Sequence, residues 1–506
     1  MSPSATLRRV LFWVCVPCFV MGGLMVYVTL AVCLSMSPST THRLHHLQRV
    51  KFTAPGATAR LGYAAQPRGP FWRGDMDANK TGLWNRLQYK LDLRNSHVLR
   101  SVKVKGPPGV QRLTSASESG RANAEVKGRL CAFNQTSVET ALPEFQTLPL
   151  HIREFILRMF CRDFRLLIDQ PRLCAAGAPR GSKETPFLLL AIKSRDEHRD
   201  QRQVIRDTWG QQGQVRGRSG AGGLVRRLFL LGRGRGGDGR LNRTLEEQLK
   251  QENERHGDLL RWDFADAFFN LTLKDVLFWG WLARRCPDAR FVFKGDDDVF
   301  VRTPALLDYL QAQLDAEGAK AARGLKADPT LRDFVAGDVI PLARPILSAD
   351  VKYYIPALLY TGKYPTYAGG GGVVYSGALA LRLREVSRRV ALFPIDDVYV
   401  GMCLERLGVV PKHEPAFLTF DFPEGEEEDN PCAYHTILLV HKRSPEAVRR
   451  LWAEDLEPPP DCLNATLRVD PTAAPKRAPK RAPKRAAQKR GQAKEGPREM
   501  DIMDLM

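Results

Sequence analysis

Between residues 148 and 462, short apolar runs alternate with segments of helical pattern. The apolar runs are FLLLAIK (187–193), LVRRLFLLG (224–232), LLRWDF (259–264) and FVF (291–293). At the start of this region five apolar residues have the spacing of one helix face: Ile152, Phe155, Ile156, Met159 and Phe160. Strands that alternate with helices usually form a mostly parallel sheet with helices on its faces. We therefore predict a single α/β, Rossmann-like domain over residues 148–462, with flanking helices.

The N-terminal residues predict a membrane anchor. Residues 10–34 contain no charged residue, and a helix of this length, at about 1.5 Å per residue, exceeds the roughly 30 Å hydrocarbon core of a bilayer. Arg8 and Arg9 precede the run. We expect residues 1–9 to be a cytoplasmic tail and residues 10–34 a transmembrane signal anchor. A cleaved signal peptide is the alternative, but its apolar segment is normally shorter.

Glycosylation motifs and cysteines predict that the remaining chain lies in the secretory lumen. Five Asn-X-Ser/Thr motifs all follow the apolar run, at Asn79, Asn134, Asn242, Asn270 and Asn464. Seven cysteines also follow it: Cys131, Cys161, Cys174, Cys286, Cys403, Cys432 and Cys462. An oxidising compartment favours disulfides among them, and their odd number leaves at least one without an intramolecular partner.

Sequence of low complexity flanks the predicted domain. Residues 35–147 are rich in Pro, Gly, Ser and Arg and have no sustained periodicity, which is typical of a stem with low order. Residues 463–506 contain the repeat APKRAPKRAPKR and form a basic tail. Ten Lys/Arg and four Asp/Glu in residues 471–506 account for part of the formal net charge of +20. Charge alone therefore does not indicate a nucleic-acid partner, and we expect none.

Three consecutive aspartates, Asp296, Asp297 and Asp298, follow the apolar run FVFKG. Like charges side by side repel one another, so the triplet indicates either a solvated turn or a bound cation. At the end of a strand, alternate carboxylates can bind a hard cation such as Mn²⁺ or Mg²⁺, which in turn can bridge a diphosphate. A solvated acidic turn or a structural Ca²⁺ loop is the alternative.

A second acidic pair, Asp396 and Asp397, begins a predicted helix in LFPIDDVYVGMCLERLG (392–408). One of the two can cap the helix, which leaves the other to project into a cleft. Between the two acidic sites, YAGGGGVVYSG (367–377) contains Gly370 and Gly371. Residues without a side chain permit close approach of the backbone to a ligand, and a plain turn is the alternative.

Six motifs in this order resemble the β1,3-N-acetylglucosaminyltransferase family. They are KSRDEHRDQRQVIRDTWG (193–210), FFNLTLKDV (268–276), FVFKGDDDVFV (291–301), KYYIPALLY (352–360), YAGGGGVVYSG (367–377) and FPIDDVYVGMCL (393–404). The runs LLIDQP (166–171), PFLLLAIKS (186–194) and SGALALRL (376–383) are most similar to the branch that extends poly-N-acetyllactosamine. The resemblance covers about residues 145–462. It implies a type II Golgi membrane enzyme with a glycosyltransferase-A fold.

The resemblance also implies a reaction, a cofactor and site residues. The reaction is inverting transfer of GlcNAc from UDP-GlcNAc to the 3-hydroxyl of a terminal galactose on a glycoprotein or glycolipid, with Mn²⁺ or Mg²⁺. The metal ligands correspond to Asp296, Asp298 and His441, and the general base to Asp397, with Asp396 beside it. The nucleotide-side residues correspond to Arg202, Arg206, Trp209, Asp266, Lys274, Asp296, Asp297, Gly370 and Gly371.

For some of these residues a purely structural role is the alternative. Arg202, Arg206 and Trp209 also fit helix packing and surface charge, and His441 also fits a core histidine with satisfied hydrogen bonds. A β1,3-galactosyltransferase would share the metal motif, the fold and the base. A non-catalytic chaperone or lectin-like member would be expected to lack a metal ligand or the base, and both are present. Oligomers with itself or with other glycosyltransferases are a further expectation.

Overall fold

The computed structural model describes residues 82–88, 91–92, 132–174, 185–234, 243–422 and 425–469. The predicted membrane anchor (10–34) and the repetitive tail (471–506) lie outside these residues. No helix in the part of the chain that is described is long and apolar enough to cross a membrane.

Nine strands form the large sheet, and their bounds are β1 (Leu166–Ile168), β2 (Leu188–Lys193), β3 (Gly213–Arg216), β4 (Gly222–Arg233), β5 (Leu259–Ala265), β6 (Phe291–Asp296), β8 (Val335–Ile340), β9 (Tyr367–Ser376) and β10 (Lys412–His413). Their order is β1-β5-β4-β2-β6-β9-β8-β10, and β3 pairs with β4. The four predicted apolar runs are the parallel strands β2, β4, β5 and β6. The predicted α/β fold is therefore confirmed.

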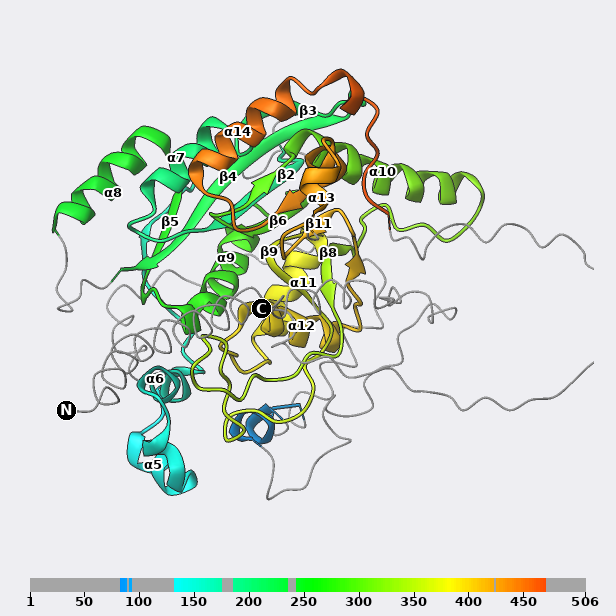
Figure 1. Cartoon of the computed structure of the whole chain (residues 1–506). Helices are drawn as coiled ribbons and strands as arrows, with labels where there is room; N and C mark the ends of the chain where they lie inside the picture. Colours follow the sequence, from blue (N-terminus) through cyan, green and yellow to red (C-terminus); the bar gives the residue numbers. More distant parts are fainter. Residues whose placement is uncertain are drawn as a thin grey trace, which may run out of the picture. The chain divides into compact units, whose positions relative to one another are not determined.

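Helices cover both faces of this sheet (Figure 1). The longer helices are α6 (Leu150–Arg158), α7 (Arg199–Asp207), α8 (Arg243–His256), α9 (Leu271–Arg285), α10 (Thr303–Ala322), α11 (Gly377–Ser387), α12 (Asp396–Leu407) and α14 (Pro445–Leu456). Alternate residues of β2 (Leu188, Leu190, Ile192) belong to one buried apolar cluster with side chains of α7, α8, α10 and α14. The helices α9, α11 and α12 pack against one another and contact β4, β6 and β9.

The glycine run YAGGGG is part of strand β9, so neither a bare turn nor a loop describes it. The strand is antiparallel to both of its neighbours, β6 and β8. The residues that follow the glycines, Val373, Val374 and Tyr375, are buried and favour strands. Gly371 alone has a positive φ within the run, at +85°.

A second, three-stranded sheet brings distant segments to the end of β6. It consists of β7 (Phe300–Val301), β11 (Phe417–Leu418) and β12 (Leu439–Val440), in the order β11-β12-β7. The pair β12–β7 is antiparallel, with Val440 opposite Phe300. The residue after β12 therefore lies beside the residues that precede β7.

Part of the predicted stem belongs to the folded domain, which corrects the boundary at residue 147. Residues 83–88 are helical, and the indole of Trp84 is fully buried and donates to Leu392 O at 3.0 Å. Asn85 exchanges hydrogen bonds with the backbone of Thr361. The stem composition is polar on average, so a single buried tryptophan within it gave no periodic signal.

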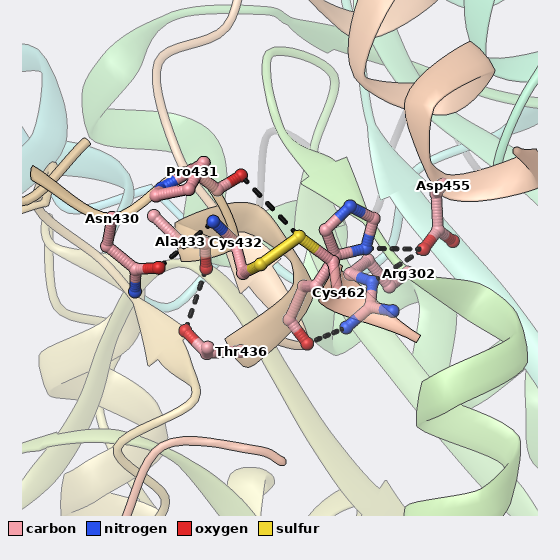
Figure 2. The surroundings of a disulfide bond; sticks show 9 residues. Arg302, Asn430, Pro431, Cys432, Ala433, Thr436, Asp455 and Cys462 are labelled. Carbon is pink, nitrogen blue, oxygen red and sulfur yellow. Dashed lines mark hydrogen bonds and ion pairs between the residues drawn. A yellow bond between two sulfur atoms is a disulfide. The ribbon is translucent and has the colours of Figure 1, made fainter. Parts of the chain in front are cut away.

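Disulfides join segments that lie far apart in the described chain. Cys174 pairs with Cys286 and Cys432 with Cys462, and Cys161 is also disulfide-bonded. Figure 2 shows the second bond, near which Arg302 donates to Asp455 at 2.7 Å. Cys403 is a buried free thiol, as the odd number of cysteines requires.

Candidate active site

Asp296, Asp298 and His441 form one group at the end of β6. Their side-chain ligand atoms all lie within 4.8 Å of one another. The imidazole Nε2 of His441 is 3.2 Å from Asp298 Oδ1 and 4.0 Å from Asp296 Oδ2. Asp296 is the last residue of β6, and His441 directly follows β12, so the pairing of β12 with β7 brings the histidine to the aspartates.

The backbone fixes the orientation of this group. The Nδ1 of His441 donates to the carbonyl oxygen of Thr419 at 3.1 Å, which leaves Nε2 to face the carboxylates. The backbone N–H of Arg443 donates to the carbonyl oxygen of Asp298 at 2.8 Å. Lys442, between them, has a left-handed backbone with φ of +59°. This unusual conformation lets His441 and the Arg443 N–H both contact the aspartate run.

Asp298 and His441 are held together by a hydrogen bond. Burial alone would raise the pKa of Asp298, but the hydrogen bond to His441 and the charge of that imidazole together lower it. Burial alone would lower the pKa of His441, and the bond to Asp298 raises it. Two carboxylates and one imidazole form a donor set suited to Mn²⁺. A cation that binds here must displace the His441 proton.

Asp297 contacts a different histidine from the one in the candidate metal group. Its Oδ2 is 2.9 Å from Nδ1 of His198, the residue that precedes α7. This hydrogen bond raises the pKa of His198. Asp296 and Asp298 therefore belong to the candidate metal group, and Asp297 does not.

The second acidic pair begins α12, but neither aspartate caps it. The N-cap residue is Ile395, without a side-chain cap, so the cap prediction is wrong. The carboxylate of Asp396 is buried and forms an ion pair with Lys193. Asp397 accepts a hydrogen bond from Lys294 Nζ at 3.2 Å through Oδ1. Both side chains are held by lysines of the sheet, because the carboxylates need counter-charges where they are buried.

Analysis of the sequence missed the three charged residues that surround this pair. They are Lys193, Lys294 and Asp275, which are 5%, 3% and 1% exposed. A lysine inside or at the end of an otherwise apolar strand was the available signal, since lysine is seldom buried unless it is paired.

Gly370 and Gly371 separate the two acidic sites. A Cβ built on Gly370 would lie 3.2 Å from Asp397 Oδ2, and one built on Gly371 would lie 3.0 Å from Cβ of His441. Each glycine therefore lies close to a side chain of one of the two candidate sites, and the predicted approach to a ligand stays a prediction.

The three residues Arg202, Arg206 and Trp209 have the contacts of the packing alternative, not those of a nucleotide site. Arg202 is fully buried and forms an ion pair with Glu252 at 2.7 Å. Arg206 forms ion pairs with Glu252 and Asp258. Trp209 is buried against Phe293. Guanidinium groups that are buried and paired in this way offer no accessible surface to a nucleotide.

Lys274 and Asp266 form a buried ion pair at 2.9 Å. Lys274 Nζ also donates to the carbonyl oxygen of Ser194, and Asp266 accepts from the N–H of Gly232 at 3.0 Å. This pair joins α9 to the ends of β2, β4 and β5, so its contacts are with the chain itself.

Comparisons with known proteins agree with this arrangement. A family model described as galactosyltransferase matches residues 200–415. N-acetyllactosaminide beta-1,3-N-acetylglucosaminyltransferase 2 of Mus musculus is 41% identical over 396 residues, which cover 78% of this chain and 89% of that protein. The Homo sapiens protein of the same name is 41% identical over 389 residues, 77% of this chain and 87% of that one. UDP-GlcNAc:betaGal beta-1,3-N-acetylglucosaminyltransferase 7 of Rattus norvegicus is 40% identical over 62% of this chain and 73% of its own length.

Proposed function

The chain belongs to the β1,3-N-acetylglucosaminyltransferase family, and on this basis we propose that it transfers GlcNAc from UDP-GlcNAc to the 3-hydroxyl of a terminal galactose. The product is a β1,3 linkage that extends poly-N-acetyllactosamine. The observation that carries the proposal is the placement of Asp397 across Gly370 and Gly371 from Asp296, Asp298 and His441.

Asp397 acts as the general base. Inversion at the anomeric carbon requires a single in-line displacement: the galactose 3-oxygen bonds to the anomeric carbon as the bond to UDP breaks. The hydroxyl proton passes to Asp397 Oδ2, whose partner oxygen Oδ1 is already held by Lys294. Gly370 faces Oδ2, and the absence of a side chain there leaves space beside this oxygen, since a Cβ would lie 3.2 Å from it.

Asp296, Asp298 and His441 would hold a divalent cation, Mn²⁺ or Mg²⁺. Their donor atoms are close enough for one ion, and the carboxylate oxygens suit a hard cation. When bound, the ion supplies positive charge to the diphosphate of the departing UDP.

The cellular setting that we propose is the Golgi membrane. Residues 10–34 anchor the chain as a single-pass type II protein, and the domain faces the lumen. The disulfides and the five glycosylation motifs support an oxidising secretory compartment. Acceptors are galactose-terminated glycans on glycoproteins or glycolipids.

The donor sugar is tested directly. The family model that matches is named for galactosyl transfer, so UDP-GlcNAc and UDP-galactose are offered separately to the purified protein with a lactosamine acceptor and Mn²⁺. We expect transfer from UDP-GlcNAc. Faster transfer from UDP-galactose would replace GlcNAc by galactose in the proposal.

Two variants separate the roles of the acidic sites. Asp298→Asn should weaken UDP binding and its dependence on Mn²⁺, because an amide is a poorer ligand for a hard cation. Asp397→Asn should retain both in calorimetric titration and lose about 10²–10⁴-fold in kcat, because an amide accepts no proton from the hydroxyl. An Asp397→Asn protein that turns over normally refutes the assignment of the base.

A further inference from the structure

Five charged side chains, the candidate base among them, form one cluster. This lysine–aspartate cluster consists of Lys193 of β2, Lys294 of β6, Asp275 of α9, and Asp396 and Asp397 of α12. Charges buried in the interior are costly unless they are paired and hydrogen-bonded. The family motifs account for the two α12 aspartates but give no function to the other three members.

Lys294 is the centre of this cluster. Its Nζ donates to Asp275 Oδ2 at 3.2 Å, to Asp396 Oδ2 at 3.4 Å and to Asp397 Oδ1 at 3.2 Å. An ammonium group has three N–H donors, so each of them has one carboxylate partner. Asp275 of α9 is 1% exposed, so its buried carboxylate fixes the position of the Lys294 Nζ. The ammonium is therefore held in three directions.

The hydrogen bond from Lys294 determines how Asp397 is oriented. It is the one side-chain hydrogen bond of Asp397 within the described chain, and it engages Oδ1. The other oxygen, Oδ2, faces Gly370. The side chain of Asp397 is 17% exposed, against 10% for Asp396 and 1% for Asp275. Of the three carboxylates, Asp397 is thus the one most open to a substrate.

The charge balance of the cluster leaves one carboxylate in excess, because three aspartates face two lysines. Lys294 is buried and hydrogen-bonded to three carboxylates, and such pairing favours the charged form of an ammonium group. The charged or titratable groups that face Asp397 are Lys193, Lys294, Asp296, Asp396 and Tyr367. Lys294 is the cation among them that bonds to it.

We propose that Lys294 is the positioning residue of the reaction: anchored by Asp275, it holds Asp397 with Oδ1 bound and Oδ2 presented to the acceptor hydroxyl. Asp396 is the counter-charge of Lys193 and not a second base. The proposal rests on the proposed function, in which Asp397 accepts the galactose proton.

The main test is Lys294→Met, which removes the charge at similar side-chain length. We expect kcat to fall about 10–100-fold, since misplacement of a reacting group by about 1 Å has such an effect. KM for UDP-GlcNAc and calorimetric UDP binding with Mn²⁺ should stay within about threefold of wild type. The acidic limb of the kcat profile should move to higher pH, because the cation beside the base is lost. Lys294→Arg should keep the limb in place with a reduced kcat, because a planar guanidinium cannot reproduce three divergent hydrogen bonds.

Arg406→Met is the matched control. Arg406 is also buried, lies on α12 and forms an ion pair with Asp92 at 2.8 Å. Its loss should lower the thermal unfolding midpoint without moving the acidic limb. An unchanged limb in folded Lys294→Met, or the same shift in Arg406→Met, overturns the proposal.

A charge-balanced variant covers the case in which Lys294→Met does not fold. The double substitution Asp275→Asn with Lys294→Met leaves Lys193 with two carboxylates and the same excess charge. This double variant should fold, with a low kcat and an acidic limb of the kcat profile at higher pH. A double variant with the kcat of wild type overturns the proposal.

The proposed function can be wrong while the role inferred for Lys294 is right. If the wild-type protein transfers nothing from UDP-GlcNAc, that function is wrong, and infrared difference titration against Asp397→Asn still decides the role of Lys294. The Asp397 carboxylate band should disappear at higher pH in Lys294→Met than in wild type. Coincident titration curves overturn the proposal whatever the reaction is.

Discussion

Replacing Gly371 by alanine tests whether the backbone of β9 positions the metal group. Gly371 has φ of +85°, and a Cβ there would lie 3.0 Å from both Cβ and Cγ of His441 and 3.3 Å from its Nδ1. Contacts of 3.0 Å are tighter than most contacts that real Cβ atoms make, so the His441 side chain must move by a few tenths of an ångström. That movement strains its hydrogen bond to the Thr419 carbonyl.

Two costs contribute to the expected effect. The left-handed backbone costs alanine about 1–2 kcal/mol of folding stability. Displacement of a metal ligand, or of the group that orients it, commonly lowers metal affinity about 10–100-fold, which corresponds to roughly 1.4–2.7 kcal/mol. We therefore expect a lower unfolding midpoint and a 10–100-fold higher Mn²⁺ concentration at half-maximal rate.

Gly220→Ala separates the two costs. Gly220 has the same φ of +85°, and nothing lies within 4 Å of its added Cβ. This variant should lose the same backbone stability and keep the Mn²⁺ dependence of wild type. If Gly371→Ala shows no change in the Mn²⁺ requirement while remaining folded, the inferred contact with His441 has no functional consequence, and the reasoning is refuted.

Three further outcomes are expected. Serine at both Cys432 and Cys462 should lower stability by about 3–4 kcal/mol through loss of loop closure, and an unchanged thermal midpoint in the double variant contradicts this. Burial would raise the pKa of Asp258, but the bonds of its carboxylate to Arg206 and Arg227 lower that pKa. The contribution of Asp258 to stability is therefore complete above about pH 4 and is lost as the pH falls further. The free energy of unfolding, measured from pH 5 to 2, should depend less on pH in Asp258→Asn than in wild type. Truncation after Asp470 should leave turnover on a small neutral acceptor near wild type, given the repetitive composition beyond it, and a large loss with that acceptor would contradict this.

The central sheet could be predicted because its strands are buried on both faces. In β2, β4, β5 and β6, runs of mostly apolar residues end at polar residues, and the carboxyl ends of parallel strands meet at one edge. The position of Asp296 and Asp298 at that edge followed from this rule.

Contacts between residues far apart in the sequence could not be predicted from local sequence patterns. The cap expected for Asp396 is a sound local inference, yet Lys193 from another element binds its carboxylate. The partners of Arg206, Glu252 and Asp258, lie on or just after α8, and no periodicity joins them. A plain turn was the alternative for the glycine run because glycine disfavours strands, and pairing with β6 and β8 on both sides overrode that preference.

The small sheet that joins β12 to β7 determines when the protein can become active during synthesis. A nascent chain folds from its N-terminus as it is made, and β2, β4, β5 and β6 can pair long before β12 leaves the ribosome. Such an incomplete chain already has Asp296 and Asp298 but lacks His441 and the pairing that orients it. In the proposed function, the ability to bind the nucleotide sugar through a metal is therefore acquired only after β12 has been made. Chains interrupted before residue 441 would then fold in part without consuming the donor.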